Sequence, residues 1–139
     1  MKVILDTNVM ISAFAARGLC SALLEYCLNR CEIVISEEIF RELSTHIADK
    51  LKLPQVLHDR ILALLRDSCT ISEVSPVDDV QCRDANDLHV LGLARQSGAG
   101  CVITGDKDLL ELKSYGDTRI VTPREFWQII RQGGERPAT

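Results

Sequence analysis

Apolar positions along the chain follow two patterns. Short, solidly apolar runs predict buried strands, and stretches with apolar residues every three or four positions predict amphipathic helices. Strands are expected at 2–6, 32–35, 101–104 and 119–121, with a further short one at 70–74. Helices are expected at 21–30, 36–49, 55–67 and 84–96, and from Pro123 onward. Alternating strands and helices, with strands this apolar, predict an α/β fold whose parallel sheet is covered on both faces.

Polar residues mark where several of these helices begin or end. Ser36 precedes two acids, Glu37 and Glu38, which predicts a capped helix start with negative charge in its first turn. Residues 122–125 (TPRE) form a capping-box sequence with proline at the first helical position. The glycine-containing stretch 97–100 (SGAG) is expected to end the fourth helix.

Length and composition indicate one domain. A chain of 139 residues with 46% hydrophobic and only 4% aromatic residues can bury one aliphatic core. We expect a single domain at 1–132 and a flexible tail at 133–139. No apolar run reaches the roughly 18–20 residues that span a bilayer, and the first residues do not resemble a signal peptide. A cytoplasmic protein without a membrane segment is therefore expected.

Cysteine spacing and net charge limit which metal sites and which ligands can be expected. The six cysteines contain no C-x-x-C pair, and no histidine or cysteine pair completes a zinc site with Cys27 and Cys31. We therefore expect reduced thiols. The net charge of −4 argues against a strongly electrostatic nucleic-acid binder. Four converging carboxylates neutralised by divalent cations would leave the rest of the surface nearly neutral.

Two acids follow predicted strands. Asp6 comes directly after KVIL, and Asp106 follows CVIT with one glycine between them. Sites in open parallel sheets form beyond the carboxyl ends of the strands. If these two strands are parallel, both carboxylates project from the same edge of the sheet.

Two further acids fall near the apolar faces of predicted helices. At about 100° per residue, Glu42 lies roughly 60° from Ile39 and Asp87 roughly 40° from Leu91. An acid beside a buried stripe is costly unless it is paired or bound to a metal. Asp87 is therefore the more informative of the two.

Each acid also has an ordinary structural explanation. Asp6 can form an Asx turn, Glu42 can be a surface acid, and Asp106 can cap a helix. Asp84 and Asp87 stand at the N-cap and N3 positions of one helix, where acids are electrostatically favoured. The functional interpretation depends on their joint order along the chain.

That joint order resembles the PIN-domain family of nucleases, and most closely its branch of toxin components of toxin–antitoxin systems. The resemblance spans nearly the whole chain. The matching stretches are VILDTNVMIS (3–12), ISEEIFREL (35–43), RDANDLHVLGLA (83–94), ITGDKDLL (103–110) and IVTPREF (120–126).

The resemblance implies a three-layer α/β/α fold with a central parallel sheet of about five strands. It also implies a Mg²⁺ or Mn²⁺ centre held by Asp6, Glu42, Asp87 and Asp106. Family members commonly form dimers, so a homodimer is expected, with an antitoxin protein as a further partner.

Other positions are implied less directly. Asn8 and Thr104 match positions that shape or hydrogen-bond the centre, whereas Asp84 and Asp108 match acids that are less regularly ligands. Glu38, one turn before Glu42, competes for the helical role. The basic residues near these acids, which would either contact RNA phosphates or be solvated surface charges, are Lys107, Arg83 and Arg95.

The acids favour a metal-dependent nuclease, and the resemblance implies a ribonuclease acting on single-stranded RNA. Oxygen ligands suit Mg²⁺ or Mn²⁺, and two such ions about 3.5–4 Å apart can activate water and hold the leaving 3′-oxygen. One alternative is a catalytically inactive PIN-like module for RNA binding or assembly. A phosphotransferase with a nucleophilic aspartate is disfavoured, because Asp6-Thr7-Asn8 lacks the second Asp of D-x-D and no phosphate-binding loop occurs.

Overall fold

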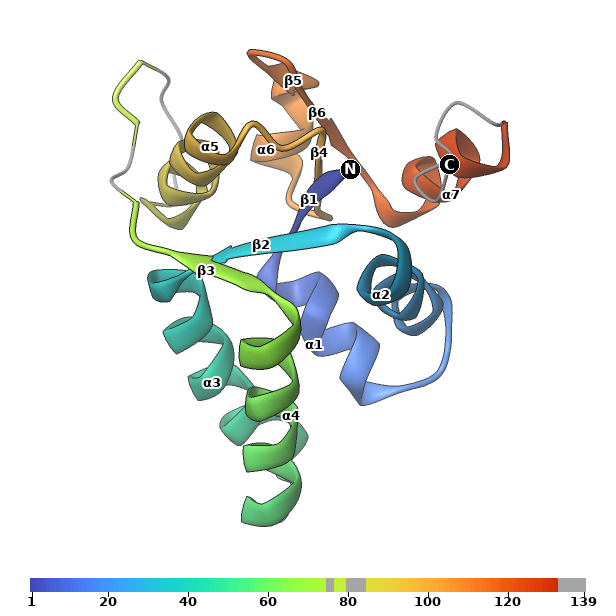
Figure 1. The fold of residues 1–139 in the computed structure, drawn as a ribbon, viewed down its shortest axis with the longest axis vertical. Coiled ribbons are helices and arrows are strands. Elements are labelled where there is room, and N and C mark those ends of the chain that lie inside the picture. Colours follow the sequence, from blue (N-terminus) through green and yellow to red (C-terminus); the bar gives the residue numbers. More distant parts are fainter. Residues whose placement is uncertain (75–76, 80–84, 133–139) are drawn as a thin grey trace.

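The computed structural model describes residues 1–74, 77–79 and 85–132, and these form an α/β fold around one sheet (Figure 1). The sheet has six strands in the order β3-β2-β1-β4-β6-β5. The strands are β1 (Lys2–Leu5), β2 (Glu32–Ser36), β3 (Thr70–Ser72), β4 (Cys101–Ile103), β5 (Ser114–Tyr115) and β6 (Thr118–Val121). All neighbouring strands are parallel except β5 and β6, which pair antiparallel.

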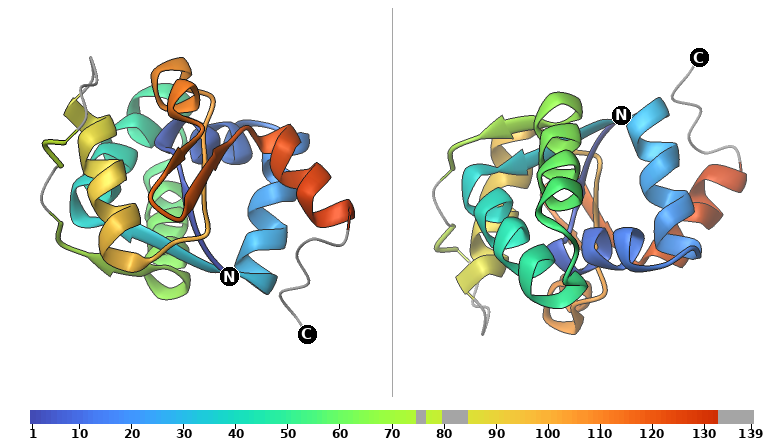
Figure 2. Two further views of the ribbon diagram at one scale, coloured as in Figure 1. Left: turned by 90° about the horizontal axis from the view of Figure 1, so that it is seen from above. Right: turned by 90° about the horizontal axis from the view of Figure 1, so that it is seen from below.

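Seven helices lie within the described residues. They are α1 (Thr7–Ala15), α2 (Leu19–Arg30), α3 (Glu37–Leu51), α4 (Gln55–Ser68), α5 (Ala85–Ser97), α6 (Lys107–Leu112) and α7 (Pro123–Arg131). Helices α1, α3 and α4 lie on one side of β2 and β3, and α5 lies on the other (Figure 1). Helix α2 also packs against α7, and the two lie side by side in both views of Figure 2. Helices therefore cover both faces, as expected of a three-layer fold.

The strand order reverses at β1. The chain moves outward from β1 to β2 and β3, then returns through α5 to place β4 on the opposite side of β1. Because parallel crossovers are right-handed, this change of direction puts α5 on the face opposite α1, α3 and α4. The reversal leaves an open crevice at the carboxyl ends of β1 and β4, where open α/β sheets place their sites.

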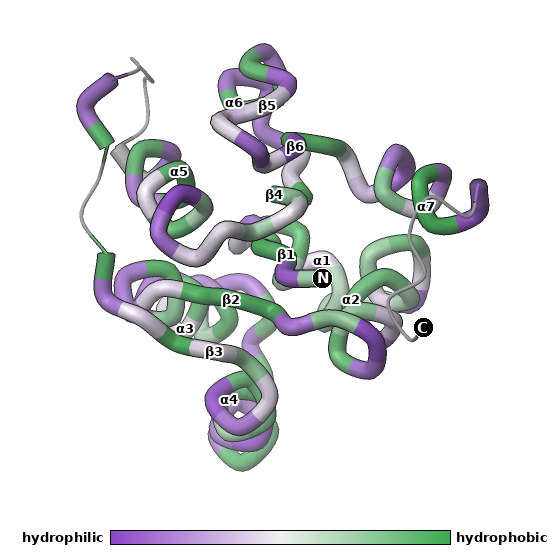
Figure 3. Tube along the Cα trace, turned by 45° about the horizontal axis from the view of Figure 1, so that its top comes forward, coloured by the Kyte–Doolittle hydropathy of each residue, from purple (hydrophilic) through white to green (hydrophobic). Residues whose placement is uncertain are grey.

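The core is aliphatic, as the composition predicts. The strands contribute fully buried side chains such as Ile4, Ile33 and Val102, and β2 is coloured as hydrophobic along most of its length (Figure 3). Among the described residues, Phe40 and Phe126 are the aromatic members of the buried core. The described cysteines are free thiols, and Cys82 lies outside the described residues.

Several predicted helix boundaries are confirmed. The Ser36 hydroxyl accepts a hydrogen bond from the Ile39 amide at 3.0 Å, which caps α3. Thr122 and Glu125 form both hydrogen bonds of the capping box at the start of α7. Helix α5 ends at Ser97, directly before Gly98, whose φ of 69° is in the left-handed region.

Other expectations need correction. The sheet has six strands rather than about five, because β5 is a two-residue strand formed by the hairpin through Gly116 and is too short to show a periodicity. It also makes the sheet mixed rather than wholly parallel. Helix α1 was not expected, because its buried positions lie on most of its sides and give no amphipathic stripe. Helix α2 begins at Leu19 rather than Ser21.

No single helix among residues 1–74, 77–79 and 85–132 is long and apolar enough to cross a membrane. Helices α1 and α2 together pass the same test of length and composition, as a pair bent by 108°.

The Ser36 cap gives a test of the fold. Ser36→Ala removes a buried acceptor and leaves the Ile39 amide without it, so the free energy of unfolding should fall by about 1–2 kcal/mol in urea titrations. Thr45→Ala is the matched control, since exposed Thr45 bonds only within its own helix. Its effect should stay within about 0.5 kcal/mol. Equal effects of the two changes would contradict this account of the helix start.

Candidate metal centre

Asp6 and Asp106 lie at the carboxyl ends of two neighbouring parallel strands. Leu5 of β1 pairs with Ile103 of β4, and the Asp6 amide donates to the Ile103 carbonyl at 3.0 Å. Asp6 is therefore the first residue after β1, and Asp106 lies shortly after the end of β4. The parallel arrangement expected from the sequence brings both acids to the crevice between these strands.

One pocket joins these acids to two more from distant helices. Its cavity volume is about 130 Å³. Its walls are formed by Asp6, Thr7, Asn8, Ile39, Glu42, His46, Asp87, Val90 and Asp106. All four acids predicted to form the centre thus line a single pocket, and each comes from a different segment: the end of β1, α3, α5 and the loop after β4.

A buried threonine links the two strand-end acids. The Thr104 hydroxyl donates to Asp6 Oδ2 at 2.8 Å and accepts from the Asp106 amide at 3.0 Å. Thr104 is fully buried. Because its single proton goes to Asp6, this hydroxyl fixes the orientation of that carboxylate relative to the backbone of Asp106.

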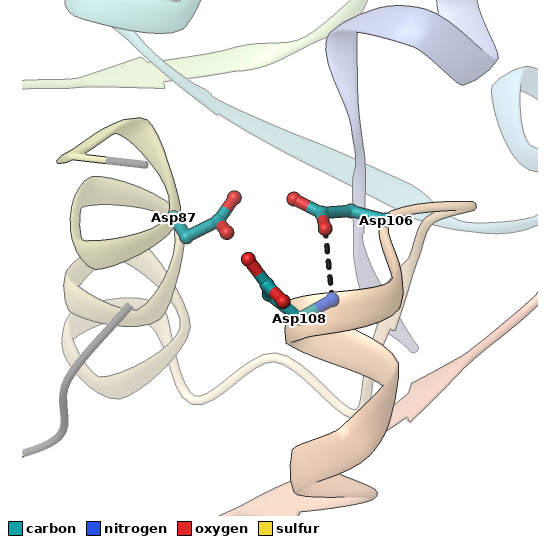
Figure 4. A group of neighbouring side chains, drawn as sticks. All are labelled: Asp87, Asp106 and Asp108. Atoms are coloured by element: carbon teal, nitrogen blue, oxygen red, sulfur yellow. Dashed lines mark hydrogen bonds between the residues drawn. The ribbon is translucent and has the colours of Figure 1, made fainter. Parts of the chain in front are cut away.

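Three carboxylates approach one another closely across α5 and α6. One ligand oxygen from each of Asp87, Asp106 and Asp108 lies within 4.8 Å of the other two. Figure 4 shows the three side chains directed toward a common space. Asp106 also caps α6 by accepting a hydrogen bond from the Asp108 amide at 2.9 Å. Asp108, a secondary candidate from sequence, therefore lies beside two of the principal ones.

Asp87 is buried, with a relative exposure of 5%. This agrees with its computed position near the apolar stripe of its helix. A carboxylate this inaccessible is costly in an apolar environment unless partners compensate its charge.

The two glutamates of α3 occupy different places. Glu42 lines the pocket, and its Oε1 accepts a hydrogen bond from the Thr7 hydroxyl at 2.9 Å. Glu38 is exposed, pairs with Arg41 at 3.0 Å, and lines a separate hollow with Glu37 and Glu73. Of the two, Glu42 is the one placed beside the other acids.

Burial and like charge act together on Asp6. Its pKa is raised mainly by burial, and the charges of Asp106 and Glu42 raise it further. The Thr104 hydrogen bond lowers the pKa in part. A divalent cation beside these groups would offset both the desolvation and the repulsion.

Some of the remaining candidate residues lie at or near the pocket, and others do not. Asn8 lines the pocket with an exposed side chain, and exposed Lys107 follows Asp106 in the chain. Arg95 lies outside the pocket, near the end of α5, where its guanidinium donates to the Tyr115 hydroxyl at 3.5 Å. Asp84 and Arg83 lie outside the described residues.

Sequence reasoning missed Thr7 and His46 as pocket residues. His46 follows Glu42 by one helical turn, so the same computation of helix faces would have placed it on that side of α3. Thr7 adjoins Asp6, but its contact with Glu42 spans 35 residues and has no local signal.

Two solved structures share the fold of this chain. The crystal structure of FitAcB from Neisseria gonorrhoeae matches with a TM-score of 0.60 and 22% identity, over 88% of this chain and 98% of that one. The structure of FitAB bound to an IR36 DNA fragment matches with a TM-score of 0.58 and 20% identity, over 87% and 94%. At these identities the likeness shows the fold alone. No curated protein matches the chain.

A comparison with models of protein families identifies the family of this chain. The model of the PIN domain matches residues 2–108, which include all four pocket acids and extend from β1 into α6. Since this stretch is well over half of the 139 residues, the chain belongs to the PIN domain family.

Proposed function

We propose that this protein is a metal-dependent ribonuclease that hydrolyses phosphodiester bonds in single-stranded RNA. The observation that carries the proposal is the convergence of Asp6, Glu42, Asp87 and Asp106 on one pocket of a PIN domain. Asp108 adds a fifth carboxylate at its side. Several negative charges in one small pocket repel one another and destabilise the folded protein. A bound divalent cation would offset that repulsion, which is why the acids support a cation-dependent activity.

The donor chemistry fits Mg²⁺ or Mn²⁺. Both ions prefer hard oxygen ligands, and the Asp87, Asp106 and Asp108 oxygens are already close enough to share an ion. Asp6 and Glu42 would complete its surroundings or hold a second ion across the pocket. Cations bound there would supply an activated water and neutralise charge on the departing oxygen.

The chain's own residues would orient these groups and the substrate. Thr104 holds the Asp6 carboxylate, and the cap on α6 holds that of Asp106. Asn8 and Lys107 have exposed side chains beside these acids, where an amide and an ammonium group can meet the phosphates on either side of the scissile bond.

We further propose that the enzyme is the toxin of a toxin–antitoxin pair and acts as a homodimer. Support comes from the resemblance of its motifs to that branch of the family, and the solved neighbours include FitAB bound to DNA. Helix α4 exposes Val56, Leu57 and Leu64, an apolar surface suited to a second copy. The antitoxin would restrain the enzyme until it is removed.

Cleavage of single-stranded RNA is the direct test. Wild-type protein should cleave a labelled single-stranded RNA with Mn²⁺ or Mg²⁺ and lose that activity in a chelator. Asp6→Asn and Asp106→Asn should each lower the rate roughly 100-fold or more, because each removes a charge that would neutralise and position the cation.

Asp49→Asn is the matched control, since Asp49 is an exposed acid on α3 outside the pocket, and its rate should equal that of the wild type. Activity that survives in Asp6→Asn would indicate a contaminating nuclease. Wild-type protein that binds RNA without cleaving it would favour the inactive RNA-binding alternative.

The raised pKa of Asp6 predicts an effect on stability without metal. A carboxyl whose pKa is higher in the folded state costs stability once the pH rises through that pKa. Asp6→Asn removes the charge and keeps an oxygen to accept from Thr104. In chelator at neutral pH, the variant should therefore melt at a higher temperature than the wild type in a thermal unfolding scan.

This gain should shrink as the pH is lowered, because Asp6 then becomes neutral in the wild type as well. Added Mn²⁺ should reverse the order by stabilising the wild type more than the variant. A metal-free Asp6→Asn protein that melts below the wild type at neutral pH would contradict the charge-crowding argument.

The toxin role predicts a growth phenotype. Induced wild-type protein should slow growth of a bacterial host, whereas Asp6→Asn should not, because growth arrest would require RNA cleavage. Co-expression of a cognate antitoxin, sought among the products of neighbouring reading frames, should restore growth. Equal arrest by wild type and Asp6→Asn, measured as doubling time at matched expression, would argue against this role.

A further inference from the structure

A second buried threonine contacts the pocket. Thr7 begins α1 and has a relative exposure of 4%. Its hydroxyl donates to Glu42 Oε1 at 2.9 Å, across 35 residues of sequence. The bond joins the segment that carries Asp6 to the helix that carries Glu42.

The chemistry of this contact is directional. A hydroxyl has one proton, and here it goes to a carboxylate oxygen rather than to a backbone carbonyl. Hydrogen bonds to charged groups are shorter and stronger than neutral ones. Glutamate has three rotatable side-chain bonds, so fixing one oxygen restricts where the other can point.

The contact parallels that of Thr104 with Asp6. Both threonines are buried, both donate to a pocket carboxylate, and both adjoin the carboxyl ends of the central strands. Thr104 connects two acids that already lie on neighbouring strands. Thr7 instead connects the segment after β1 to Glu42 on α3. The long glutamate side chain can adopt more orientations there than an aspartate held between neighbouring strands.

We propose that Thr7 is a positioning residue that holds Glu42 in its catalytic orientation. The inference rests on the ribonuclease activity proposed above. Thr7 acts through Glu42 and does not itself touch the substrate. Its loss should therefore lower turnover while leaving RNA binding nearly unchanged.

Two substitutions separate the hydroxyl from the shape of the side chain. Thr7→Val keeps the volume and removes the donor, whereas Thr7→Ser keeps the donor and removes a methyl group. We expect Thr7→Val to lower kcat roughly 10-fold with KM changed less than about twofold, and Thr7→Ser to retain most of kcat. If Thr7→Val fails to fold, Thr7→Ala replaces it as the donor-free variant.

A double-mutant cycle ties the effect to Glu42. Thr7→Val should have little further effect on the residual rate of Glu42→Gln, because the carboxylate it positions is already gone. Thermal unfolding of the same four proteins in chelator should show that the two changes are not additive. This second readout does not require RNA cleavage.

The outcomes distinguish the two proposals. If the wild type is active and Thr7→Val has the same kcat, the proposed role of Thr7 is wrong and the ribonuclease proposal stands. The same holds if Thr7→Ser is as impaired as Thr7→Val. Additive losses of kcat in the cycle also overturn that role. Wild type without metal-dependent cleavage overturns the ribonuclease proposal, and the role of Thr7 falls with it.

Discussion

The pairing of β1 with β4 is the constraint on which the rest of the site depends. Because the chain first moves outward through β2 and β3, the return to the other side of β1 must cross the opposite face of the sheet. That crossing places α5 over β1 and β2, and a pocket lies beside the carboxyl ends of β1 and β4. Asp6 and Asp106 stand at those two ends, and α5 delivers Asp87 to the same crevice.

This site holds four acidic side chains close together in one pocket. Burial, and then the charges of Asp106 and Glu42, raise the pKa of Asp6. The protein offsets part of this cost with hydroxyl and amide donors: Thr104 for Asp6, Thr7 for Glu42, and the Asp108 amide for Asp106. These donors hold the carboxylate oxygens in place before a ligand binds. Binding then costs less side-chain conformational entropy.

Local sequence patterns could predict the acids closest to regular structure. Asp6 and Asp106 follow apolar strands directly, and the burial of Asp87 follows from helical periodicity. The sequence left Glu42 and Glu38 as competitors for the helical position. In the structure Glu42 lines the pocket and contacts Thr7, whereas Glu38 is exposed. Asp108 was ranked second because the family resemblance makes it a less regular ligand. Its approach to Asp87 depends on how α5 packs beside the six-residue α6, which no local pattern shows.

What the sequence patterns missed in the fold has a similar cause. Helix α1 is buried on most sides and so shows no stripe, and β5 is only two residues long. Both are specified by packing and by a turn rather than by periodicity. The boundaries set by capping side chains, at Ser36 and Thr122, were predictable because their hydrogen bonds reach only three residues ahead.

The origin of the pocket acids has a consequence for how the folded chain holds together. Asp6 and Glu42 come from the first third of the sequence, whereas Asp87, Asp106 and Asp108 come from its second half. A cation shared among them would act as a removable cross-link between the two parts of the chain, and its binding free energy would add to that of folding. Resistance to proteolysis would then follow the availability of divalent cations, and under the proposed function the protein would be most durable under the conditions that make it active.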